Sequence, residues 1–227
     1  MLFPSVTRAQ MEEADRIMVE DLGVSLLQMM ELAGAAVAHV AGLVAPRSAL
    51  VLAGSGGNGG GALAAGRHLA HRGVEVTVVR SSEARRPETA RQWDVLSRIG
   101  ARGLADPKEA DVVIDGVLGY SRSGPPRGRA GELIGWMNEA SAPIVSVDLP
   151  SGLDPDTGAG PSVVAASVVT LALPKPGLRG VEADLWLADI GIPPVVWERL
   201  GVDVPSDPFE GARVVPIRRT DAGWLSG

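Results

Sequence analysis

A run of glycines and two aspartates are the parts of this chain best suited to hold and transform a ligand. Six glycines fall among the eight residues Gly54 to Gly61, between the apolar run 49–53 and a helical pattern that begins at Ala62. A strand, a glycine-rich turn and a helix in this order expose backbone N–H groups to an anion, usually a nucleotide phosphate. Glycine also reaches positive φ freely and lets a ligand approach the main chain. The segment therefore predicts a nucleotide site.

Each of the two aspartates closes an apolar strand. Asp115 precedes a glycine-rich loop, and Asp148 precedes a turn in which a proline and a glycine flank Ser151 and aim its hydroxyl back toward the sheet. Ligands of open parallel sheets bind at the carboxyl ends of strands. Two such acids beside a glycine loop predict acid–base or cation chemistry on a nucleotide. Ordinary cap or turn roles are the alternatives for Asp115 and for Asn58 in the glycine run.

Alternating strands and helices must position these residues. The strands that we expect are 48–53, 74–79, 112–115, 143–148, 167–173 and 184–187, and the helices between and after them are 62–72, 87–99, 128–140 and 193–200. This alternation predicts crossover connections and a largely parallel sheet covered on both faces. Two helices come first, one capped by Thr7 and running through Val19, the other starting near Ser25. The segment after Gly201 is rich in Pro, Asp and Arg and is expected to be an irregular tail.

Length and composition fit one α/β domain spanning residues 1–227, with 45% apolar residues available for its core. The formal charge of −6 argues against a nucleic-acid surface, which needs a basic field. The chain has no cysteine, so disulfides, thiolate metal sites and a cysteine nucleophile are excluded, and a cytoplasmic location is expected. The first residues lack the pattern of a signal peptide.

The second helix has two features that bear on partners. The segment 24–44 is rich in apolar residues, but Gln28, Glu31 and His39 interrupt it, which favours a buried helix over a membrane span. Its alanine-rich face would permit close packing on the sheet or on a second subunit. Core packing and a homodimer are both compatible with this pattern.

Several familiar motifs fit less well. Gly54-x-Gly56-x-x-Gly59 matches the dinucleotide fingerprint, but a match is nearly automatic in so glycine-rich a loop, and the next strand ends in 80–82, Arg-Ser-Ser, rather than in an acid. A dinucleotide oxidoreductase is therefore a minor alternative. The Walker A lysine is missing, Ser151 lacks a nucleophile elbow, and the three histidines have no zinc-ligand spacing.

Taken together, the chain resembles the NAD(P)HX epimerase family, which acts on hydrated nicotinamide cofactors. The segments that carry the resemblance, in order, are 30–34, 54–61 continuing through 69, Asp115 with Gly119, 147–154, 173–178 and 189–193. The resemblance implies a three-layer α/β/α sandwich of Rossmann-like type, often dimeric. It also implies interconversion of the R and S epimers of NADHX and NADPHX, so that a separate dehydratase can restore the cofactor.

The resemblance also assigns residues. It implies that Asn58, Asp115 and Ser151 bind potassium, for which oxygen ligands are suited. It places Asp148 against the hydrated nicotinamide as the acid–base residue. The residues that it implies for nucleotide binding are Gly56, Gly57, Asn58, Gly59, Gly60, Gly61, Gly119, Tyr120, Ser121, Arg122, Ser123, Gly124, Pro125 and Asp148. Among these, Arg122 is the expected partner of a phosphate or ribose.

Two departures from the family pattern affect the glycine loop. The family has Asn and Asp where this chain has Gly57 and Gly61. Loss of the Asp removes a charge and up to two hydrogen bonds, about 1–3 kcal/mol of ligand binding. We expect an epimerase that works with a separate dehydratase. The alternative is a catalytically silent paralogue that binds a nucleotide as a sensor or partner subunit.

Overall fold

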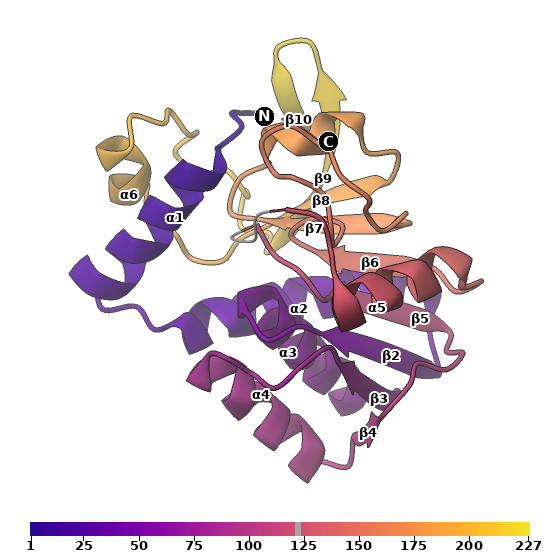
Figure 1. Ribbon diagram of the computed structural model, residues 1–227. Coiled ribbons are helices and arrows are strands. Elements are labelled where there is room, and N and C mark those ends of the chain that lie inside the picture. Colours follow the sequence, from indigo (N-terminus) through magenta and orange to yellow (C-terminus); the bar gives the residue numbers. More distant parts are fainter. Residues whose placement is uncertain (121–123) are drawn as a thin grey trace.

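A single ten-stranded sheet runs through the computed structural model, which describes residues 1–120 and 124–227 (Figure 1). The spatial order of its strands is β1-β10-β9-β8-β7-β6-β5-β2-β3-β4. The strands from β8 to β4 in this order are parallel, whereas β9, β10 and β1 are antiparallel to their neighbours. The sheet is therefore mostly parallel, as the alternating pattern predicted.

The parallel strands confirm the predicted ones, with ends that differ by at most two residues. They are β2 (Ser48–Ala53), β3 (Glu75–Arg80), β5 (Val112–Gly116), β6 (Ile144–Val147), β7 (Ser167–Leu171) and β8 (Asp184–Ala188). The short edge strand β4 (Arg102–Leu104) was not predicted. Its three residues, Arg-Gly-Leu, carry too little apolar pattern to indicate a strand.

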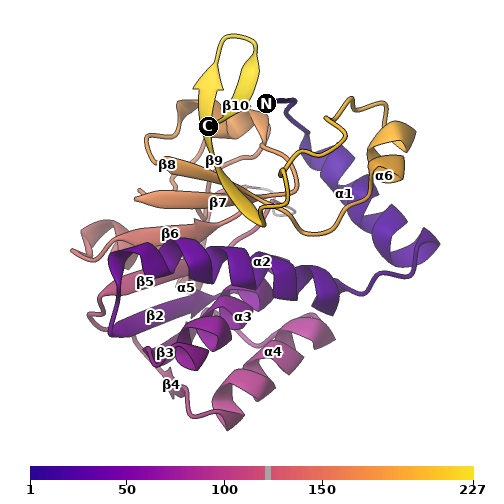
Figure 2. The ribbon, with the colours of Figure 1, turned by 180° about the vertical axis from the view of Figure 1, so that it is seen from behind.

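Helices cover both faces of the sheet, so the molecule has three layers, as expected. α2 (Leu26–Ala41), α3 (Gly57–His71) and α4 (Pro87–Arg98) lie on one face, and α5 (Gly128–Glu139) lies on the other (Figures 1 and 2). The period of two along β2 divides its side chains between these faces. Leu50 and Leu52 belong to the core that contains the apolar side chains of α5, and Val51 packs in the core shared with α2 and α3.

The glycine run differs from the prediction, because the helix begins at Gly57 rather than at residue 62. None of the glycines from Gly54 to Gly61 has a positive φ. They are needed instead for close packing. A Cβ at Gly59 would lie 2.0 Å from the Gly54 carbonyl oxygen, and a Cβ at Gly60 would lie 2.6 Å from the Met30 sulfur. The glycines bring the start of α3 against β2 and α2.

The predicted N-terminal helices are confirmed, with Thr7 and Ser25 as their N-caps. The first is α1 (Arg8–Arg16), which continues as the π-helix η1 (Ile17–Asp21). Beside it lies α6 (Pro194–Arg199), tied to it by the ion pair of Arg199 with Asp21 at 3.0 Å (Figure 1).

The second predicted helix, α2, ends in the 3₁₀ helix η2 (Gly42–Val44). By length and composition, these two helices together could cross a membrane. The core helix of a globular protein can have the same length and composition. Half of the apolar stretch is buried inside the protein. The alanines of its face, Ala33, Ala36, Ala38 and Ala41, are all buried. The face is therefore used inside the chain, for contact with α3 and the sheet.

The expectation of an irregular tail after Gly201 is wrong for its last part. β9 (Val214–Thr220) and β10 (Gly223–Ser226) form an antiparallel hairpin, and β1 (Leu2–Phe3) adds to its edge. A proline and two arginines interrupt the apolar pattern of β9, so its sequence does not indicate a strand. β9 is a strand because its backbone pairs with the edge of β8. Trp224 and Phe3, on the paired strands, are fully buried.

Candidate functional site

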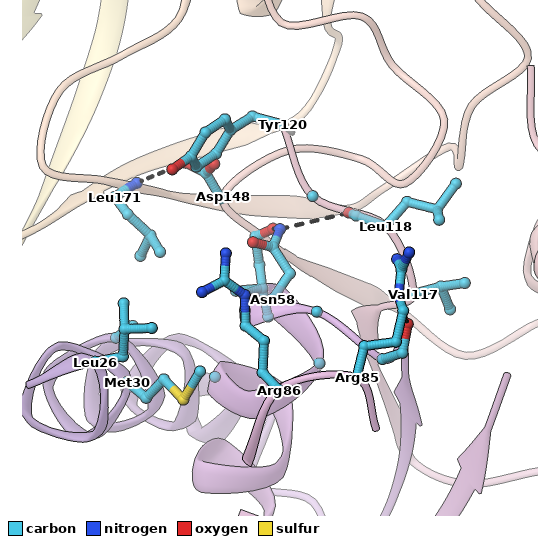
Figure 3. A pocket seen from close by; sticks show the side chains of 18 of the residues that line it. Leu26, Met30, Asn58, Arg85, Arg86, Val117, Leu118, Tyr120, Asp148 and Leu171 are labelled. Atoms are coloured by element: carbon cyan, nitrogen blue, oxygen red, sulfur yellow. Dashed lines mark hydrogen bonds between the residues drawn. The ribbon is translucent and has the colours of Figure 1, made fainter. Parts of the chain in front are cut away.

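A cavity of about 450 Å³ lies at the carboxyl ends of the parallel strands, where the sequence predicted a site. Its walls come from α1, α2, the start of α3, and the segments that follow β3, β5, β6 and β7. Figure 3 shows residues from several of these walls, among them Leu26, Asn58 and Asp148. This volume is in the range of small-molecule sites. The cavity is where the predicted residues must meet if they are to act together.

Asp115 and Ser151 form a buried polar pair beneath this cavity. The Asp115 side chain is fully buried; its Oδ1 accepts from the Ser151 hydroxyl at 2.5 Å, and its Oδ2 accepts from Ser146 Oγ at 2.8 Å and from Ser151 N at 2.9 Å. Within the described chain, these donors are all neutral. Burial raises the pKa of Asp115 because the carboxylate is removed from water. A cation bound beside Asp115 would stabilise its ionised form.

Asn58 joins this pair from the first turn of α3. Its amide Nδ2 donates to the Val147 carbonyl at 2.7 Å and to the Leu118 carbonyl at 3.4 Å (Figure 3). Ser151 Oγ in turn accepts from Leu118 N at 2.8 Å. The structure therefore brings Asn58 together with Asp115 and Ser151, although about ninety residues separate the first from the last. The cluster contains the Asp115 carboxylate, the Ser151 hydroxyl and two carbonyl oxygens, and the amide nitrogen of Asn58 is hydrogen-bonded to these carbonyls.

Asp148 lies in the wall of the cavity with a strained backbone. Its φ is +67°, a left-handed conformation that is uncommon outside glycine and clusters at functional sites. Oδ1 accepts from Lys175 Nζ at 2.5 Å and from Leu171 N at 3.1 Å. Oδ2 is buried and has no hydrogen-bond partner among the described residues. One oxygen is thus fixed by the protein, and the other is left for a ligand.

Lys175 is a site residue that the sequence reasoning missed. Its side chain is 0% exposed, and besides Asp148 its Nζ contacts the Leu171 carbonyl at 2.8 Å. An ammonium group is almost never fully buried unless it is paired. Lys175 is one of only two lysines in the chain and follows an apolar strand. That position was the available signal.

Asp15 was missed as well. It lies on α1 in the cavity wall, where its Oδ2 accepts a hydrogen bond from the hydroxyl of Tyr120. Burial raises the pKa of both groups, and for Tyr120 the neighbouring Asp15 charge adds to the effect. The signal was a carboxylate on the helix face that also carries Met11 and Met18, which are both buried.

A positively charged rim surrounds the start of α3. Arg85 and Arg86, which precede α4, line the cavity (Figure 3). Arg127, which directly precedes α5, also lines it. Arg85 Nε donates to Ser55 Oγ at 2.9 Å, which holds its guanidinium beside the helix N-terminus. Arg80, at the end of β3, instead stacks on Trp93, with its Cζ 5.0 Å from the centroid of the ring. Guanidinium groups and free N–H groups at a helix start together suit phosphate.

The structure places the other predicted nucleotide residues as follows. The predicted residues that line the cavity are Gly56, Gly57, Asn58, Gly59, Gly61, Gly119, Tyr120 and Asp148. Gly60 faces Met30 and Thr89 and is not part of the wall. Gly124 and Pro125 line a separate hollow next to it. Ser121, Arg122 and Ser123 lie outside the described residues.

Comparison with known proteins agrees with this fold and site. The model of a family described as YjeF-related protein N-terminus matches residues 26–177. The structure of the yeast protein ynu0 superposes with a TM-score of 0.76 at 24% identity, covering 98% of this chain and 99% of that one. The likeness to the yeast protein establishes the fold, a Rossmann-like α/β sandwich.

Sequence relatives identify the family. An NAD(P)H-hydrate epimerase of Dehalogenimonas lykanthroporepellens is 41% identical over 95% of this chain and 94% of its own length. A bifunctional NAD(P)H-hydrate repair enzyme of Hyperthermus butylicus is 43% identical over 77% of this chain, which covers 36% of that enzyme. The chain belongs to the NAD(P)H-hydrate epimerase family.

Proposed function

We propose that this protein is an NAD(P)H-hydrate epimerase that interconverts the R and S forms of hydrated NADH and NADPH. The observation that carries the proposal is the free oxygen of Asp148 in the cavity, fixed beside a buried lysine and across from a glycine-rich helix start. The relative that aligns over nearly the whole chain is named for this activity. No observation favours the silent paralogue or the oxidoreductase.

The chemistry asks for little more than proton transfer. Epimerisation opens the C–O bond of the hydrated ring carbon and re-forms it on the other face, and a carboxyl group such as that of Asp148 can give or take a proton in these steps. Lys175 holds one oxygen of Asp148, and the other is presented to the ligand. Arg85, Arg86 and the start of α3 bind the phosphates and orient the ring toward Asp148.

The direct test is an assay of R/S NADHX interconversion by NMR or chiral chromatography, corrected for the spontaneous rate. Asp148→Asn keeps the size of the side chain but cannot exchange a proton, and it should lower the rate about 10²- to 10⁴-fold. Asp94→Asn, on the exposed side of α4, is the matched control and should retain the wild-type rate. A wild type no faster than solvent would reject the epimerase and leave nucleotide binding alone.

We also propose that the oxygen cluster binds potassium. The donor set of Asp115, Ser151 and Asn58 with nearby carbonyls is that of a hard cation, and the buried carboxylate has neutral donors around it. Among the described residues no group of three or more His, Cys, Asp or Glu offers a transition-metal site. Potassium, when bound, supplies positive charge beside the glycine-rich helix start.

This cation site is testable by thermal unfolding in KCl and in choline chloride at equal ionic strength. A ligand that binds only the folded state raises Tm by mass action, so Tm should be higher in KCl. Asn58→Ala should abolish the difference, because it removes a ligand while leaving Asp115 in place. Equal Tm values in the two salts for the wild type would refute potassium binding.

The remaining expectations concern partners and location. Bifunctional relatives combine the repair activities in one longer chain, so we propose that a separate dehydratase consumes the S epimer produced here. The homodimer and the cytoplasmic location stay predictions, which light scattering and cell fractionation would check. The alanine face that motivated the dimer is buried within the chain, so a dimer would have to use other surfaces.

A further inference from the structure

The cavity that holds Asp148 has a second carboxylate in a different wall. Asp15 is contributed by α1, which stands beside the carboxyl ends of the strands, whereas Asp148 follows β6 within the sheet (Figure 1). Asp15 takes part in no ion pair among the described residues; its described partner is the Tyr120 hydroxyl. A carboxylate on an otherwise apolar helix face, turned into a cavity, is costly to keep for packing alone.

Epimerisation gives this second carboxylate a task. The hydroxyl leaves from one face of the ring, and water must add to the other, so a proton is handled on each face. Asp148 directly follows a strand of the sheet, and its Oδ1 is fixed by Lys175 Nζ. One carboxylate fixed in this way cannot reach both faces of a ring bound in a single orientation. The helix α1 contributes a second carboxylate to the same cavity from a different element.

We propose that Asp15, held by Tyr120, is the second acid–base group of this cavity and serves the ring face opposite Asp148. The inference rests on the proposed function. One carboxyl group protonates the hydroxyl as its C–O bond breaks, and the ring nitrogen donates its lone pair to the carbon. A water molecule then adds to the same carbon from the other face and gives a proton to the other carboxylate. One water leaves, one enters, and the proton count is unchanged.

The surroundings of Asp15 suit the donating role. Burial raises the pKa of Asp15, and the charge of Asp148 raises it further. The hydrogen bond from Tyr120 and the positive charges of Lys175 and Arg86 lower it. Burial is the largest of these effects. Asp15 therefore keeps its proton to a higher pH than an ordinary carboxyl group does. Activity that needs this proton should fall as pH rises through the pKa of Asp15.

The test compares Asp15→Asn with wild type in the same R/S interconversion assay, over a pH series and after subtraction of the spontaneous rate. We expect kcat to drop about 100-fold or more, and the alkaline fall seen in wild type to be absent from the residual rate. Glu12→Gln, an exposed neighbour on α1, is the matched control and should behave as wild type. Circular dichroism and Tm establish that Asp15→Asn is folded.

Tyr120→Phe provides a second variant that keeps the carboxylate. It removes a hydrogen bond that lowers the pKa of Asp15, so the alkaline fall should move to higher pH. A merely structural role for Tyr120 would change Tm and leave this midpoint in place. A midpoint that stays, or moves to lower pH, overturns the inference even if Asp15→Asn does not fold.

The outcomes also separate the inference from the proposed function. If Asp15→Asn keeps the wild-type rate and Asp148→Asn does not, Asp148 works alone and the inference fails while the epimerase stands. If neither substitution changes a wild-type rate that exceeds the spontaneous rate, the epimerase stands but the inference fails; a wild-type rate equal to the spontaneous rate rejects the proposed function itself. Loss of activity in both variants, with an altered pH profile in Asp15→Asn, supports both.

Discussion

Gly61 stands in the cavity wall at a position where a side chain has room. A Cβ there would lie 3.5 Å from Val147 Cγ1 and 3.9 Å from Ala33 Cβ, which are ordinary contacts. The resemblance described above implies an aspartate at this position, near the positive end of a helix, which favours negative charge. We predict that Gly61→Asp folds and binds NADP about fivefold more tightly, since one added hydrogen bond contributes about 1 kcal/mol. Isothermal calorimetry measures the change in Kd.

Two variants serve as controls for this change. Gly61→Ala adds the Cβ without the carboxylate and should leave the Kd for NADP unchanged. Gly60→Ala places its Cβ 2.6 Å from the Met30 sulfur and 3.0 Å from Thr89 Oγ1 and should lower Tm, because these side chains must repack. Weaker binding by Gly61→Asp than by Gly61→Ala would contradict the prediction and indicate that the ligand itself fills this space.

At the same scale, the position of a residue after a strand was enough to predict part of the site. Asn58, Asp115, Asp148 and Ser151 follow strands of one parallel sheet, and such strands end at one rim. Asp15 and Lys175 gave a weaker signal, since their burial and their partners depend on how α1 and the segment after β7 pack on that rim. Side-chain pairing across elements is not encoded in local spacing.

The contact between α2 and α3 sets how closely the helices forming the cavity approach each other. A Cβ at Gly34 would lie 2.5 Å from Ala64 Cβ and 2.8 Å from the Ala65 backbone nitrogen. We predict that Gly34→Ala lowers the free energy of unfolding by about 1–3 kcal/mol through overpacking. Because α2 also carries Met30 and other cavity residues, KM should rise as well. Denaturant unfolding and the epimerisation assay measure the two effects.

A glycine-to-alanine substitution at Gly135 should have the opposite effect on the free energy of unfolding. Gly135 lies within α5, is exposed, and has no atom within 4 Å of an added Cβ. Alanine there should stabilise the protein by about 0.5–1 kcal/mol through helix propensity. If Gly34→Ala were as harmless as Gly135→Ala, the close approach of α2 and α3 would not be a real constraint.

Elements with strong periodic patterns were predictable, and those defined by their neighbours were not. The strands from β2 to β8 read as apolar runs because they are buried on both faces, apart from β4 at the edge. The start of α3 was placed too late, because glycine is a poor helix former and masks a helix whose first turn is held by packing. β9 and β10 are strands because β8 offers an edge to pair with.

At the scale of the whole molecule, the two ends of the chain pair with each other at one edge of the sheet, and this pairing fixes where α1 begins beside the cavity. β1 pairs with β10, and Trp224, fully buried, donates from Nε1 to Ser5 Oγ at 2.8 Å. Just beyond, Val6 N donates to the Pro174 carbonyl at 2.9 Å, next to Lys175 in the site. Capping by Thr7 then starts α1 at a fixed point. The position of Asp15 therefore depends on contacts made by the last residues of the chain.

Trp224→Ala should reveal this coupling. Removal of a buried tryptophan destabilises by about 3–5 kcal/mol, and it should also free the segment that leads into α1. We predict that hydrogen exchange becomes faster in α1 peptides than in α3 peptides, which pack on the parallel strands far from the hairpin. Trp136→Ala, on α5, is the matched control: it lowers global stability without selecting α1. If exchange in α1 rises no more in Trp224→Ala than in Trp136→Ala, the termini do not hold α1, and Asp15 must be positioned by its contact with Tyr120 alone.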